Sequence, residues 1–169
     1  MEEYNSLSNN KKYKILFVCL GNICRSPSAE AVMKKRVHDA GMQLQIEIDS
    51  AGIIDYHEGE QADARMKAHA IRRGYKLESI SRPVRSWDFQ EFDLIIGMDN
   101  RNISDLKHLA PDLESLSKIH QITEFSQNKL YDHIPDPYYS GAEGFELVLD
   151  LLEDACDGLL DYCNYILSK

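Results

Sequence analysis

The sequence predicts one α/β domain built on a mostly parallel sheet of the doubly wound class. Short apolar runs alternate with longer segments of helical period, which is typical of βαβ units. The chain has 169 residues, and at that length about 70% of the unfolded surface is buried on folding, so no disulfide is needed to complete a core. The longest apolar run, residues 15–20, is far below the roughly 18 residues of a membrane span.

The predicted strands are the short apolar runs. The first is Lys-Ile-Leu-Phe-Val at 14–18, and the others lie at 44–48, 93–97 and 118–122. Residues 1–12 are polar and aperiodic, so we expect a flexible extension there and the domain over 13–169.

The predicted helices are rich in Ala, Leu, Met, Lys and Glu. They cover residues 27–40, 61–73, 100–109 and 143–167. Because helices follow several of the strands, we expect a parallel sheet that helices cover on both faces.

The net charge of −9 and the pI near 5.1 argue against a nucleic-acid-binding module, since such modules need clustered Lys and Arg. The start of the chain lacks the basic residues and apolar run of a secretory signal. We therefore expect a cytoplasmic protein that binds neither nucleic acid nor membrane. In that setting we expect free thiols at Cys19, Cys24, Cys156 and Cys163.

The loop after the first predicted strand is the candidate site, since ligands of doubly wound sheets bind beyond the carboxyl ends of the strands. Residues 19–27 read Cys-Leu-Gly-Asn-Ile-Cys-Arg-Ser-Pro. We expect Ser26 to cap the next helix and Pro27 to be its first residue. Gly21 and Asn22 tolerate the left-handed backbone that a tight loop requires.

The spacing Cys-x5-Arg between a strand and a helix predicts a concave loop that binds an oxyanion. Arg25 can bind two phosphate oxygens at once. The helix dipole and Arg25 favour the thiolate of Cys19, which would be a nucleophile facing a bound phosphate. Without further context, Cys19 could equally be a small buried side chain and Arg25 a solvated charge.

Residues 18–30, Val-Cys-Leu-Gly-Asn-Ile-Cys-Arg-Ser-Pro-Ser-Ala-Glu, closely resemble the signature of the low-molecular-weight protein tyrosine phosphatases. Further family-like motifs follow in order: Asp-Ser-Ala-Gly at 49–52 after the second predicted strand, Asp63-x-Arg65, Met98-Asp99, and Asp-Pro-Tyr-Tyr at 136–139. The resemblance covers residue 13 to the end. It implies a three-layer sandwich with strand order 2-1-3-4 and a phosphate-binding loop after strand 1.

The resemblance also implies the reaction, hydrolysis of phosphotyrosine in a protein substrate through a phosphocysteine. Cys19 would attack phosphorus and Arg25 would hold the phosphate oxygens. Asp136, which Pro137 follows in a loop, would first protonate the leaving group and then activate water. No metal or other cofactor is implied, because the histidines and cysteines lack metal-ligand spacing and no nucleotide-binding glycine motif occurs.

The remaining site residues follow from the same resemblance. The substrate-binding set is Leu20, Gly21, Asn22, Ile23, Cys24, Ser26, Tyr56, Tyr138 and Tyr139. Ser50 and Asp99 would support the loop, and Cys24 could form a reversible disulfide with Cys19. The family commonly has a His bonded to the loop Asn, where this chain offers Ser79.

Three alternatives use the same loop. An arsenate reductase would need a cysteine pair midway along the chain, whereas Cys156 and Cys163 share one face of the last predicted helix, where we expect core packing. A protein arginine phosphatase carries Thr where this loop has Ile23. A phosphotyrosine-binding scaffold would lack Cys19 or Asp136. We expect the tyrosine phosphatase, as a monomer or weak dimer.

Overall fold

A four-stranded parallel sheet forms the centre of the structure, a computed structural model that describes residues 11–169. The strands are β1 (Tyr13–Cys19), β2 (Ile46–Gly52), β3 (Leu94–Gly97) and β4 (Ile119–Gln121). They lie in the order β2-β1-β3-β4 and every pairing is parallel. The predicted fold class and strand order are therefore confirmed.

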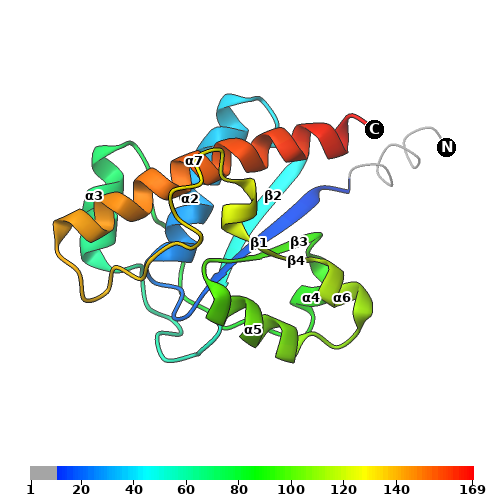
Figure 1. Cartoon of the computed structure of the whole chain (residues 1–169), viewed down its shortest axis with the longest axis horizontal. Helices are drawn as coiled ribbons and strands as arrows, with labels where there is room; N and C mark the ends of the chain where they lie inside the picture. The colour runs from blue at the N-terminus through cyan, green and yellow to red at the C-terminus, as the bar shows by residue number, and fades with distance from the viewer. Residues whose placement is uncertain (1–10) are drawn as a thin grey trace.

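Helices cover both faces of this sheet (Figure 1). One face, which carries the larger hydrophobic core, packs against α2 (Arg25–Asp39), α3 (Ala64–Arg72) and α7 (Ala142–Leu167). The other face packs against α4 (Asp88–Glu91), α5 (Asn100–Leu109) and α6 (Leu113–Ser117). A short 3-10 helix, η1 (Ile122–Phe125), follows β4.

The central strand β1 supplies side chains to both hydrophobic cores. Ile15 and Phe17 belong to the core under α2 and α7, while Leu16 and Val18 belong to the core under α4 and α5. All four are fully buried, because successive side chains of a strand point to opposite faces and helices cover both. This burial fixes the end of β1, where the candidate loop begins.

The predicted boundaries were wrong in one strand. Residues 44–48 were expected to form the second strand, with 49–52 following it, but β2 runs from Ile46 to Gly52. Leu44 is 81% exposed, and the pairing with β1 continues through the small residues Ser50 and Ala51 as far as Gly52. Small side chains buried on both faces carry no alternating pattern, so the sequence did not reveal this part of the strand.

The four predicted helices are present, with ends shifted by up to three residues. The short helices α4 and α6 and the 3-10 helix η1 were not predicted, because one turn is too short to show a helical period. Of the predicted extension over 1–12, residues 1–10 lie outside the described residues. In the described part, no helix is both long enough and apolar enough to cross a bilayer.

Gly158, in the middle of α7, allows this helix to lie against η1. A Cβ added there would lie 1.8 Å from the Phe125 carbonyl oxygen. We expect Gly158→Ala to lower the free energy of unfolding by about 2 kcal/mol, because overpacking against backbone exceeds the roughly 1 kcal/mol by which Ala favours a helix over Gly. Urea unfolding followed by circular dichroism measures the change.

The matched control is Asn164→Ala, at an exposed position of the same helix, where we expect a change within roughly 0.5 kcal/mol. A Gly158→Ala protein at least as stable as the wild type would show that α7 is free to move away from η1, contrary to the packing described above.

Candidate active site

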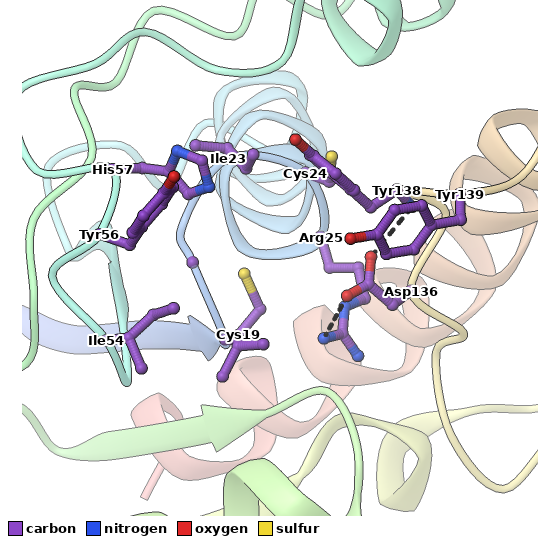
Figure 2. A pocket seen from close by; sticks show the side chains of 12 residues that line it. Cys19, Ile23, Cys24, Arg25, Ile54, Tyr56, His57, Asp136, Tyr138 and Tyr139 are labelled. Carbon is purple, nitrogen blue, oxygen red and sulfur yellow. Dashed lines mark hydrogen bonds and ion pairs between the residues drawn. The ribbon is translucent and has the colours of Figure 1, made fainter.

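A pocket of about 340 Å³ opens at the carboxyl end of β1, between the loop 19–25 and two loops from elsewhere in the chain. Figure 2 shows the Cys19 sulfur between Ile54, Tyr56 and His57 on one side and Arg25 and Asp136 on the other. The remaining lining residues are Leu20, Gly21, Ile23, Cys24, Tyr138 and Tyr139. The structure therefore brings together the three residues predicted to perform chemistry.

Two hydrogen-bonding groups face the sulfur of Cys19. The Asn22 backbone N–H donates to Sγ at 3.3 Å, and the Ser26 hydroxyl lies 3.1 Å from Sγ. Cys19 itself is buried at the end of β1, and the loop that follows it leads to the N-terminus of α2, where the helix dipole is positive. Such donors stabilise a thiolate more than a thiol.

Asn22 holds the loop in shape. Its φ of 57° places it in the left-handed region, where Asn is favoured among non-Gly residues. Its side-chain amide donates to the Ser26 hydroxyl at 2.8 Å and to the Ser50 hydroxyl at 3.0 Å. Since Ser26 accepts from Asn22, its own hydrogen has two acceptors within reach, the Cys19 sulfur at 3.1 Å and the Ala51 carbonyl at 3.3 Å.

Two local predictions about this loop were wrong. Ser26 does not cap α2, because the helix already begins at Arg25, so that Ser26 is its second residue and Pro27 its third. Gly21 is not among the residues with positive φ. Its lack of a side chain has another reason: a Cβ there would lie 3.0 Å from the His57 ring.

Two residues close to Ser79, which stands where the family commonly has a His, bond to the loop. The Ser81 hydroxyl donates to the Gly21 carbonyl at 3.0 Å, and the Arg82 backbone N–H donates to the Asn22 side-chain oxygen at 3.1 Å. Sequence reasoning missed both residues: Arg82 acts through a backbone N–H, which leaves no mark on residue type, and the Ser81 hydroxyl is 60 residues away from its acceptor in the sequence. The loop Asn is nevertheless fully bonded without a histidine.

Arg25 is oriented by the two segments that follow β3 and β4. Its Nη1 donates to the Asp99 carboxylate at 2.6 Å and to the Ile134 carbonyl at 3.0 Å. Nη2 lies 3.6 Å from the Asp136 carboxylate. Nη1 is thus occupied by protein groups, whereas Nε and Nη2 have no hydrogen bond to the described residues, so this pair of nitrogens is available to bind two oxygens of an anion.

Asp136 lies across the pocket mouth from Cys19, in the loop before α7 (Figure 2). One carboxylate oxygen accepts the Tyr138 backbone N–H at 3.0 Å, and the other faces Arg25. The side chain is 47% exposed, so solvent reaches it at the mouth of the pocket that Cys19 also lines.

Three of the residues that line the pocket are aromatic: Tyr56, Tyr138 and Tyr139. Tyr138 and Tyr139 meet edge to face at 4.9 Å between ring centroids. Ile54 and His57, which also line the pocket, were not singled out from the sequence. Their place beside Tyr56 in one loop could have indicated them.

The other cysteines differ from Cys19 in their surroundings. Burial, with Asp63 nearby as a smaller cause, raises the pKa of the Cys24 thiol, which is therefore protonated at neutral pH. Cys156 and Cys163 lie on the buried face of α7, in the core, as expected, and all four thiols are free.

Among residues 11–169, no three His, Cys, Asp or Glu side chains are grouped as metal ligands would be.

Comparisons with known proteins agree with this geometry. The family model described as low molecular weight phosphotyrosine protein phosphatase matches residues 14–166. A Streptomyces coelicolor low molecular weight protein-tyrosine-phosphatase is 41% identical over 150 residues, which cover 88% of this chain and 92% of the relative.

Two solved structures are also similar. A protein tyrosine phosphatase from Entamoeba histolytica has 47% identity and a TM-score of 0.89, covering 91% of this chain and 98% of the other. A Drosophila arginine phosphatase has 33% identity and a TM-score of 0.83, covering 88% and 96%. Both share the fold.

Proposed function

Since this chain belongs to the low molecular weight phosphotyrosine protein phosphatases, we propose that Cys19, Arg25 and Asp136 hydrolyse the phosphate ester of tyrosine in proteins. The observation that carries the proposal is the position of the Cys19 sulfur, at the base of an anion-binding loop and opposite a carboxylic acid. A nucleophile, an oxyanion clamp and a proton donor are the three groups that the reaction requires.

In the first step the Cys19 thiolate attacks phosphorus from the base of the pocket. Nε and Nη2 of Arg25, together with backbone N–H groups of the loop, hold the equatorial oxygens. The bond from phosphorus to the tyrosine oxygen breaks, and Asp136 gives its proton to that oxygen, so that neutral tyrosine leaves. The Ser26 hydroxyl beside Sγ stabilises the thiolate before the attack.

In the second step water attacks the phosphocysteine. The Asp136 carboxylate takes a proton from the water as the sulfur–phosphorus bond breaks. Orthophosphate leaves and the thiolate is restored, again beside the Asn22 N–H and the Ser26 hydroxyl. The same two donors thus favour Cys19 as the leaving group of this step.

The shape of the pocket supports phosphotyrosine as the substrate. Tyr56 and Tyr138 form walls against which a phenyl ring can stack, and Ile23 adds an apolar contact. The sulfur lies deep in this pocket, so a phenyl stem reaches it and the shorter stem of phosphoserine does not.

We place the reaction in the cytoplasm, in a monomer or weak dimer. The disulfide between Cys24 and Cys19 stays a prediction.

The test is a set of matched peptides that carry phosphotyrosine, phosphoserine or phosphoarginine. We expect kcat/KM for phosphotyrosine to exceed that for phosphoserine by at least about 100-fold, because the thiolate must reach phosphorus. Phosphate release in EDTA between pH 5 and 7 measures the rates. Faster phosphate release from the phosphoarginine peptide would instead show that this chain is an arginine phosphatase, like the Drosophila neighbour. No phosphate release from any of the peptides would refute the proposed phosphatase activity.

A further inference from the structure

The loop that carries Asp136, residues 135–140, has few attachments to the rest of the protein. We call it the acid loop. Two of its hydrogen bonds are internal, from the Tyr138 N–H to Asp136 and from the Ser140 N–H to the Pro137 carbonyl. Apart from the ion pair between Asp136 and Arg25, the described residues send it one hydrogen bond from outside, in which Arg65 Nη2 donates to the Tyr138 carbonyl at 3.0 Å.

Arg65 is itself held in place by Asp63 at the start of α3. Its Nε lies 3.2 Å and its Nη2 3.0 Å from the two oxygens of that carboxylate. Asp63 caps the helix, and its backbone N–H donates to the Ile23 carbonyl in the phosphate loop at 2.8 Å. A short chain of bonds therefore runs from the phosphate loop through Asp63 and Arg65 to the acid loop.

Two aromatic rings fix the plane of the Arg65 guanidinium. Its Cζ lies 4.9 Å from the Phe145 ring centroid and 5.4 Å from that of Tyr138, within the range of cation–π attraction. These rings belong to the first turn of α7 and to the acid loop, and α3 lies beside that end of α7 (Figure 1). Lysine has no planar fork and could not make the same contacts.

The ion pair with Asp63 contributes little to stability, because the Arg65 side chain is 48% exposed. Its effect is on geometry. We propose that Arg65 is a positioning residue, which holds Asp136 over Cys19 by fixing the backbone of Tyr138 two residues further along. This inference rests on the proposed function, in which Asp136 protonates the leaving oxygen.

If Asp136 is misplaced, hydrolysis slows only for those substrates whose leaving group needs a proton from it. For Arg65→Met, which retains an unbranched apolar stem, we expect kcat/KM to fall roughly 10-fold with phenyl phosphate, whose leaving group must be protonated. With 2,4-dinitrophenyl phosphate, whose leaving group departs as an anion, the expected fall is less than about 2-fold. Arg72→Met is the matched control, since Arg72 is exposed in the last turn of the same helix.

A double-mutant cycle tests the route of the effect. If Arg65 acts through Asp136, then adding Arg65→Met to the Asp136→Ala variant should lower kcat/KM for phenyl phosphate by less than about 2-fold. Arg65→Lys, which retains the charge, should show the same dependence on leaving group at smaller amplitude. Circular dichroism of each variant checks that the fold is retained.

Two results would overturn the inference: equal losses with both phosphates, or a loss in the Asp136→Ala background as large as in the wild type. Either would assign Arg65 a general structural effect. A wild type that does not hydrolyse phosphotyrosine would instead overturn the proposed function, so the two failures are distinguishable.

Discussion

Cys19→Ser should hydrolyse p-nitrophenyl phosphate at least about 10⁴-fold more slowly than the wild type. A serine hydroxyl stays protonated at neutral pH, whereas the proposed attack requires an anion at the position that lies beside the Asn22 N–H and the Ser26 hydroxyl. The release of p-nitrophenolate between pH 5 and 7, in EDTA, measures the loss. The variant should still bind phosphotyrosine, because Arg25 and the loop backbone are unchanged.

Cys163→Ala is the matched control, since this cysteine is fully buried in the core beneath α7. It should lose stability and keep its turnover within about 2-fold. A Cys19→Ser protein with more than a few per cent of wild-type turnover would show that another group attacks phosphorus.

Asp136→Ala is expected to lower kcat/KM for a phosphotyrosine peptide by roughly 10² to 10³-fold, the range typical of a lost general acid. The phenolate of tyrosine is a poor leaving group, and in the described part of the pocket wall Asp136 is the carboxylate that faces the sulfur. Steady-state kinetics with the peptide and with 2,4-dinitrophenyl phosphate measure the effect, which should be much smaller for the second substrate.

Asp132→Ala provides the control, because this side chain is 93% exposed and lies outside the pocket lining. It should leave both rates within about 2-fold. If Asp136→Ala behaved in the same way, the proton would have to come from a different group, and the role assigned to the acid loop would be wrong.

The sequence motifs predicted Cys19, Arg25 and Asp136 together with the supports Ser50 and Asp99, and they missed the supports Ser81 and Arg82. Cys19, Arg25 and Asp136 each have a side chain that the proposed reaction needs, so the motif reveals them. Arg82 acts through a backbone N–H, and Ser81 through a bond to a backbone carbonyl. A backbone donor places no demand on residue type, and the Ser81 hydroxyl lies 60 residues from its acceptor in the sequence, so neither contact is visible before the fold is known.

The local rules failed where the loop has a special task. Ser26 has the residue type of a helix cap, yet its hydroxyl faces Cys19 and the helix begins one residue earlier. Gly21 has the residue type of a left-handed turn, yet it gives room to His57. In both cases the needs of the site override the local preference, as expected at functional positions.

The bonds of Arg25 connect parts of the chain that are far apart in sequence. Its partners Asp99 and Ile134 are 74 and 109 residues away, whereas Cys19 and the loop belong to the first strand and helix. Contacts of such long range form late in folding, after the entropy of closing large loops has been overcome. A chain with only β1 and α2 in place would hold the nucleophile beside an Arg25 that its distant partners do not yet orient, so enzymatic activity reports the completed fold and not its first half.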